Sequence, residues 1–99
     1  MSIIEQNELS IKKLCEVYNV QKLYAFGSSV TKNFNDTSDV DFIVDFKKLD
    51  AEEYTDNYFS LKFALESLLK RNIDLLEDKA IKNPFLKKSI DASKKLVYG

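Results

Sequence analysis

Residues 20–46 decide the fold: VQKLYAFGSSVTKNFNDTSDVDFIVDF holds two short apolar runs separated by a polar stretch. The run 20–26 is rich in β-branched and aromatic residues and stops at Gly27, which predicts a strand that ends in a turn. The run 40–46 predicts a second strand, because apolar side chains alternate along it. One face of this strand is apolar and consists of Val40, Phe42, Val44 and Phe46. The other face is unusually acidic for so apolar a strand and carries Asp39, Asp41, Ile43 and Asp45.

Helix signals of two kinds, apolar periodicity and N-terminal capping residues, mark three stretches outside these runs. Apolar residues recur at i, i+3, i+4 and i+7 within residues 4–18, and one apolar arc runs along residues 52–70, so both stretches predict amphipathic helices. Asn83 and Pro84 have the residue types of an N-cap and a first-turn proline. They predict a last helix that ends near Lys95.

Two shorter elements complete the predicted order. Residues 28–34 predict a short helix, and residues 72–76 predict a third strand. The order is therefore α-β-α-β-α-β-α, which is typical of an α/β fold with a small sheet, and the residues leave the strand directions open. Because no repeat, low-complexity tract or linker interrupts the chain, we expect residues 1–99 to form a single domain.

The composition excludes several kinds of chemistry. The 99 residues include no His and one Cys, so neither a Ser-His-Asp triad nor a zinc site of Cys and His ligands can form, and carboxylate chemistry remains. Fifteen Lys and Arg residues against 16 Asp and Glu residues give a net charge of −1, which argues against direct binding of nucleic acid. The first residues do not resemble a secretory leader, and no apolar run has membrane length. We therefore expect a soluble cytoplasmic protein.

The acidic strand predicts a metal site. Asp39 and Asp41 project to the same face about 6.5 Å apart along the strand, so both carboxylates can reach one small volume. Their charges repel, and a divalent cation between them would remove this repulsion; hard oxygen ligands suit Mg²⁺. Asp74 in the third predicted strand would complete a two-metal arrangement, in which metals about 4 Å apart activate the attacking oxygen and stabilise the leaving oxygen.

The turn after the first strand predicts a phosphate site. At Gly27 the missing Cβ would let the backbone approach a phosphate, and the helix N-terminus that follows would offer free N–H groups to the anion. Ser28 adds a hydroxyl donor. A Gly-Ser or an Asp-x-Asp alone is more often a turn or a solvated strand edge, so the prediction depends on their combination.

In combination, these motifs resemble a known family. Phe26-Gly27-Ser28, a spacer of ten residues and Asp39-Val40-Asp41-Phe42 resemble the signature of the minimal nucleotidyltransferases (MNT) in the DNA polymerase β superfamily. The resemblance implies a nucleotidyltransferase-like fold with a small mixed β-sheet flanked by helices. It extends to a third acidic residue on a later strand, here Asp74, and to a last helix followed by a short apolar tail at residues 96–98.

The resemblance also implies roles for individual residues. The catalytic residues, which would also bind Mg²⁺, would be Asp39, Asp41 and Asp74, and the last of these would help to activate the acceptor hydroxyl. The residues that hold ATP or another nucleoside triphosphate would be Gly27, Ser28, Ser29 and Lys32.

The stretch after Gly27-Ser28 departs from the family pattern. Family members commonly have Arg-Ala-Arg-Gly there, whereas this chain has Ser29-Val30-Thr31-Lys32. Lys32 or the nearby Lys22 would replace part of the missing positive charge, but a lysine is a point charge and lacks the bidentate geometry of arginine.

Two functions follow from the resemblance. The first is that of an antitoxin in a HEPN/MNT toxin–antitoxin module, which transfers AMP from ATP to a tyrosine of a HEPN-family toxin. The length favours a protein acceptor over the alternative of a small molecule, since 99 residues leave no room for an acceptor-binding domain. The second is an interaction module that neutralises its partner by binding alone. The missing arginines favour it, and the three remaining aspartates oppose it.

Three further features have alternative interpretations. Phe59 and Phe63 lie outside the apolar arc of their helix, so they either anchor a partner protein or pack beneath a neighbouring loop. Cys15 falls within the apolar stripe of the first helix, which indicates a small buried hydrophobe. The lysine pairs, such as the pair at residues 87–88, indicate solvated faces.

Overall fold

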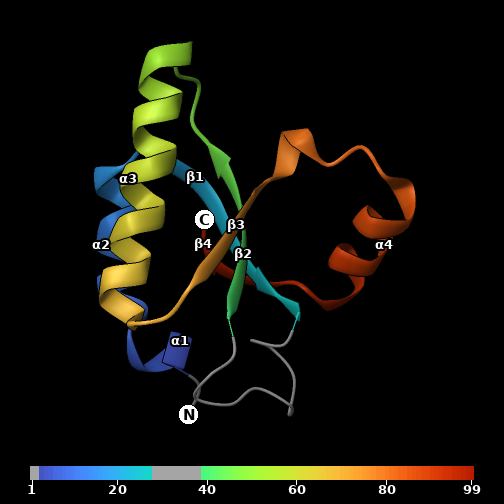
Figure 1. The fold of residues 1–99 in the computed structure, drawn as a ribbon, viewed down its shortest axis with the longest axis horizontal. Helices are drawn as coiled ribbons and strands as arrows, with labels where there is room; N and C mark the ends of the chain where they lie inside the picture. The colour runs from blue at the N-terminus through green and yellow to red at the C-terminus, as the bar shows by residue number, and fades with distance from the viewer. Residues whose placement is uncertain (1–2, 28–38) are drawn as a thin grey trace.

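The sheet has mixed strand directions (Figure 1). The computed structural model describes residues 3–27 and 39–99. Over these residues the strands, in the spatial order β3-β2-β1-β4, are β1 (Val20–Phe26), β2 (Val40–Phe46), β3 (Ile73–Glu77) and β4 (Lys95–Tyr98). Strand β2 runs antiparallel to β1 and parallel to β3, and β4 runs antiparallel to β1. This small mixed sheet with its flanking helices confirms the predicted fold class.

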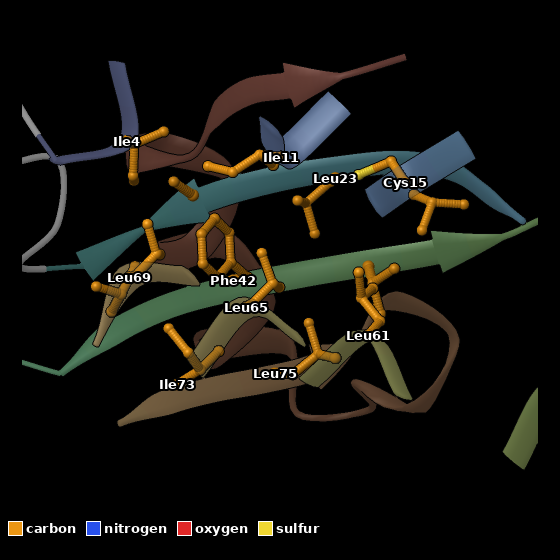
Figure 2. Close-up of a cluster of buried hydrophobic side chains, with 14 of the residues drawn as sticks. Ile4, Ile11, Cys15, Leu23, Phe42, Leu61, Leu65, Leu69, Ile73 and Leu75 are labelled. Atoms are coloured by element: carbon orange, nitrogen blue, oxygen red, sulfur yellow. The ribbon is translucent and has the colours of Figure 1, made fainter. Parts of the chain in front are cut away.

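The apolar face of β2 lies at the centre of the core. Its four side chains, which the alternation assigned to one face, are all buried: Val40, Phe42, Val44 and Phe46. Helices α2 (Glu8–Val17) and α3 (Ala51–Leu69) contribute Ile11, Cys15, Leu61, Leu65 and Leu69 to the same cluster. Figure 2 shows the Phe42 ring among side chains from the strands and from these helices. The pattern of the sequence therefore predicted the core correctly.

The burial of Cys15 confirms its structural role. Its side chain is fully buried in α2. Burial, and to a smaller extent the nearby Glu16 carboxylate, raise the pKa of the Cys15 thiol to about 12. The thiol therefore stays protonated and packs as a small apolar group.

Side-chain caps fix the N-terminal ends of α3 and of the last helix, α4 (Pro84–Ser93). The Asp50 carboxylate accepts a hydrogen bond from the Glu53 N–H at 2.8 Å, and α3 ends at Lys70, whose φ of 56° is left-handed. Asn83 accepts hydrogen bonds from the Phe85 and Leu86 N–H groups at 2.9 and 3.2 Å, at the start of α4. The bounds of α3 lie within one residue of the predicted bounds, and the predicted N-cap of α4 is confirmed.

Helix α4 lies on the opposite side of the sheet from α2 and α3 (Figure 1). A 3₁₀ turn, η2 (Asp78–Ala80), leads from β3 toward it. Ile90 is the buried residue of α4, and Ile43 is buried on the face of β2 that points away from the main core. That face is therefore apolar at Ile43 and acidic two residues earlier, at Asp41.

The ends of the chain differ from the prediction. The expected single helix over residues 4–18 is wrong, because α1 (Ile3–Gln6) and α2 are separated at Asn7, whose side-chain amide donates to the Ile3 carbonyl at 2.8 Å. The apolar tail at residues 96–98 belongs to β4, a strand that the predicted order lacked, because four residues are too few to show an alternation. Lys95 accordingly starts β4, and α4 ends at Ser93.

Two further expectations concern helices. The short helix expected at residues 28–34 lies outside the described residues. Among the helices that the structure does describe, none has the length and apolar character needed to span a lipid bilayer.

Candidate active site

The pairing of β2 with β3 brings two of the predicted site residues together. Asp41 and Asp74 are register partners in this parallel pair, so their side chains leave the same face of adjacent strands. Neighbouring strands are about 4.8 Å apart. Asp39 directly precedes β2 and is exposed, as is Asp74, whereas Asp41 is partly buried. One end of the acidic face thus carries three carboxylates within a short span.

The surroundings of Asp41 disfavour its charged form. The pKa of Asp41 is raised above its ordinary value of 3.8, first by burial and then by the negative charges of Asp74 and Asp39. The register that pairs Asp41 with Asp74, and the two-residue spacing of Asp39 and Asp41, bring the three groups close enough to interact electrostatically. A cation bound beside Asp41 would therefore relieve an unfavourable interaction that the free protein contains.

Gly27 lies in direct contact with this group. It follows Phe26, the register partner of Asp41, and its φ of +68° is in the left-handed region. A Cβ at this position would lie only 2.6 Å from Oδ2 of Asp41. The sequence assigned Gly27 to phosphate binding alone, and the structure adds a second reason for a glycine, since it leaves room for the Asp41 carboxylate.

Replacing Gly27 by Ala tests this contact. We expect Gly27→Ala to lower the free energy of unfolding by about 1–2 kcal/mol through its left-handed backbone, with an added loss from displacement of the carboxylate. Urea denaturation of Gly27→Ala in the wild-type and Asp41→Ala backgrounds measures the two parts separately. Equal losses in both backgrounds would contradict a steric contact with Asp41.

The donor chemistry suits a hard divalent cation. Asp41 and Asp74 offer adjacent carboxylate oxygens, and the exposure of Asp74 leaves room for water and phosphate oxygens. Among residues 3–27 and 39–99, no three His, Cys, Asp or Glu side chains converge closely enough to form a complete metal site. The described residues therefore fit as part of a coordination shell that a substrate phosphate would complete.

The structure describes one of the four predicted nucleotide-binding residues. Gly27 lies beside Asp41, whereas Ser28, Ser29 and Lys32 lie outside the described residues. Lys22 is the register partner of Asp45, which is four residues and thus about 13 Å along β2 from Asp41. Lys22 therefore does not supply positive charge at the carboxylate pair.

A tyrosine of α3 holds the strand that carries Asp74. Strand β3 is at the edge of the sheet, and the Tyr58 hydroxyl of α3 donates a hydrogen bond to the carbonyl of Leu75 at 2.5 Å. Burial, followed by the charges of Glu77 and Asp74, raises the pKa of Tyr58, so the hydroxyl keeps its proton as a donor. Periodicity alone cannot reveal such a bond, because it depends on how α3 and β3 meet.

The chain belongs to the polymerase β nucleotidyltransferase family, whose model, described as "Polymerase beta, Nucleotidyltransferase", matches residues 10–99. A relative from Methanocaldococcus jannaschii, named "Putative protein adenylyltransferase MJ0128", is 37% identical over 87 residues, which cover 88% of this chain and 84% of that protein. The family to which the motifs pointed is therefore confirmed.

Solved structures share the fold. A chain described as a "putative minimal nucleotidyltransferase" superposes with a TM-score of 0.78 at 22% identity, covering 96% of this chain and 95% of the other. A toxin–antitoxin complex with AMP-PNP contains a chain that matches with a TM-score of 0.73 at 26% identity, covering 94% and 73%. A complex of a tri-AMPylated HEPN toxin with an MNT antitoxin, from Shewanella oneidensis, matches with a TM-score of 0.66 at 24% identity, covering 97% and 72%. The predicted likeness to MNT antitoxins is thereby confirmed at the level of the fold.

Proposed function

We propose that this protein is an antitoxin that transfers AMP from ATP to a tyrosine hydroxyl of a HEPN-family toxin, in a reaction that depends on Mg²⁺. The observation that carries the proposal is the placement of Asp41 opposite Asp74, with Gly27 against Asp41, in a chain of the nucleotidyltransferase family. The relative named as a protein adenylyltransferase and the likeness to toxin–antitoxin complexes support the acceptor.

Each site residue has a role in this reaction. Asp39, Asp41 and Asp74 would hold Mg²⁺, which would neutralise charge on the phosphates and polarise the α-phosphoryl group. The residues that hold the triphosphate, in addition to the carboxylate site, are Gly27, Ser28, Ser29 and Lys32. Gly27 also leaves free the space that the Asp41 carboxylate occupies, because it has no Cβ.

The acceptor tyrosine binds next to Asp74. Asp74 lies on the edge strand β3 and is exposed, so a tyrosine of another protein can approach it from solvent. The tyrosine oxygen forms a bond to the α-phosphorus, the bond from that phosphorus to the bridging oxygen breaks, and pyrophosphate leaves with that electron pair. Asp74 accepts the tyrosine proton as the new bond forms.

Phe59 and Phe63 form the proposed contact with the toxin. Their side chains are 48% and 61% exposed, so the alternative that they are buried beneath a loop is wrong. The two rings stack with their centroids 6.2 Å apart. Exposed aromatic side chains at adjacent turns of a helix are typical anchors of protein interfaces.

The family match covers most of the chain, so we further propose that residues 1–99 act as a single domain. We also place the protein in the cytoplasm, because the proposed reaction consumes ATP.

A transfer assay tests the function. Protein, Mg²⁺ and a HEPN-type protein encoded beside it are incubated with ATP labelled at the α-phosphate or at the γ-phosphate. We expect label to reach the toxin from α-labelled ATP only, and to be lost when EDTA removes the metal or when the acceptor tyrosine is changed to Phe. No transfer by the wild-type protein, together with full neutralisation of the toxin, would favour an antitoxin that acts by binding alone.

A further inference from the structure

One lysine lies on the acidic face of the sheet although it is remote from the carboxylates in sequence. Lys94 directly follows α4, and its Nζ lies 4.4 Å from the centroid of the Tyr24 ring on β1. Tyr24 is the register partner of Ile43, which faces away from the main core, so Lys94 lies over the face that carries Asp41 and Asp74.

The sheet register gives the offset between Tyr24, over which this lysine lies, and the carboxylates. Phe26 pairs with Asp41, and Tyr24 is two residues earlier on the same strand. Two residues correspond to about 6.5 Å along a strand, and adjacent strands are about 4.8 Å apart. A nucleotide whose α-phosphate lies at the carboxylate pair has two further phosphates, which can span this offset toward the flexible ammonium group.

Few other cations are available for such a role. The chain contains a single arginine, Arg71, so lysines must supply most of the positive charge. Of the lysines in the described part of the chain, most are exposed, and the partly buried ones are Lys12, Lys62 and Lys94. Lys12 belongs to α2 and Lys62 to α3, on the other side of the sheet from Lys94.

The surroundings of Lys94 keep it charged and near the sheet. Its Nζ forms an ion pair with Asp91 at 2.9 Å, and this hydrogen bond raises the pKa of Lys94 above its ordinary value of 10.5. Asp78 of η2 and Tyr24 act in the same direction. Because Asp91 is exposed, the pair is weak, and a phosphate can compete with Asp91 for the ammonium group.

We propose that Lys94 binds the β- and γ-phosphates of the nucleotide and then the pyrophosphate that leaves. The proposal rests on the proposed nucleotide site at Gly27 and Asp41. It gives the site a cation that directly follows α4, far along the chain from residues 29–32, where the arginines common in the family are replaced.

Binding measurements with a matched pair of variants test this proposal. Lys94→Met keeps an unbranched side chain over Tyr24 and removes the positive charge. The control, Lys95→Met, removes the neighbouring exposed charge. Lys95 is the register partner of the buried Ala25, so it lies on the other face of the sheet. Titration calorimetry in Mg²⁺ compares ATP with AMP. We expect Lys94→Met to weaken ATP binding about ten- to a hundredfold, as loss of one charge-assisted hydrogen bond predicts, and to leave AMP binding unchanged.

Further outcomes separate this proposal from the proposed function. Recovery of ATP binding in Lys94→Arg and normal binding by Lys95→Met would support the phosphate contact. Unchanged ATP binding by Lys94→Met, or an equal loss for ATP and AMP, would overturn it even if the wild-type protein transfers AMP. A wild-type protein that binds ATP without transferring AMP would remove the proposed function, and the ATP-to-AMP comparison would still decide the role of Lys94. Absence of ATP binding by the wild-type protein would refute both.

Discussion

Replacing Asp41 by Asn is expected to reduce AMP transfer about a thousandfold while leaving the protein at least as stable as the wild type. The loss would follow from the proposed metal, because metal ions stabilise a phosphoryl transition state by several kcal/mol, with a factor of ten for each 1.36 kcal/mol. The amide has one oxygen fewer to offer and no charge. It therefore holds a divalent cation poorly at the position where Asp41 meets Asp74.

Although Asp41→Asn loses activity, we expect it to keep or gain stability, because the charged carboxylate of the wild type is unfavourable in the folded state. Burial and the charges of Asp74 and Asp39 raise the pKa of Asp41, so the folded protein binds this proton more tightly than the unfolded chain does. The resulting penalty is fully present at pH values above the raised pKa. It disappears as the pH falls through that pKa toward and below 3.8, so the advantage of Asp41→Asn is expected near neutrality and should vanish in acid.

Thermal unfolding and transfer assays check both halves of the expectation. Asp45→Asn is the matched control, since Asp45 lies on the same strand and the same face, is also partly buried, and is four residues away. It should keep its transfer activity. Mg²⁺ should raise the melting temperature of the wild type and of Asp45→Asn more than that of Asp41→Asn. Equal effects of Mg²⁺ on all three proteins would contradict a metal site at Asp41.

Replacing Phe42 by Ala is expected to lower the free energy of unfolding by about 3–5 kcal/mol, as truncation of a buried phenyl ring does in other cores. Phe42 is fully buried on an inner strand, where its ring is enclosed by side chains from several elements (Figure 2). Domains of this size have a total stability of about 5–15 kcal/mol, so the loss is a large fraction of the whole. Urea denaturation followed by circular dichroism measures it.

Phe63→Ala makes the same chemical change at a side chain that is 61% exposed. Its free energy of unfolding should change by less than about 0.5 kcal/mol, as for most surface substitutions. The same variant should bind the toxin more weakly if Phe63 anchors the partner. A stability loss similar to that of Phe42→Ala would show that the Phe59 and Phe63 stack belongs to the core and not to an interface.

Local residue patterns predicted those parts of the fold that depend on neighbours in sequence. The alternation along β2 predicted both its buried face and its acidic face, and Asn83 with Pro84 predicted the start of α4. The break at Asn7 was missed because the apolar spacing continues across it, and β4 was missed because it is short. Its pairing with β1 also joins residues about 70 positions apart, which no local pattern records.

The sequence likewise predicted one part of the candidate site and not the other. The motifs singled out Gly27, Asp41 and Asp74, and the register of β2 with β3 then placed the two aspartates side by side. The contact of Gly27 with the Asp41 carboxylate depends on atomic distances that spacing cannot supply. The position of Lys94 over Tyr24 depends on the path of the chain after α4, so the sequence could not link this lysine to the site.

The sheet order gives the two neighbouring carboxylates unequal freedom. Asp41 belongs to an inner strand that is hydrogen-bonded on both sides, whereas Asp74 belongs to an edge strand whose outer side is tied to α3 by the Tyr58 hydroxyl. Amide hydrogens on inner strands generally exchange with solvent only through large openings, and those at edges exchange through small local ones. Of the three proposed ligands of a bound cation, Asp41 would thus be fixed and Asp74 adjustable. Such a site can shift to follow an incoming hydroxyl without disturbing the strand that forms the core.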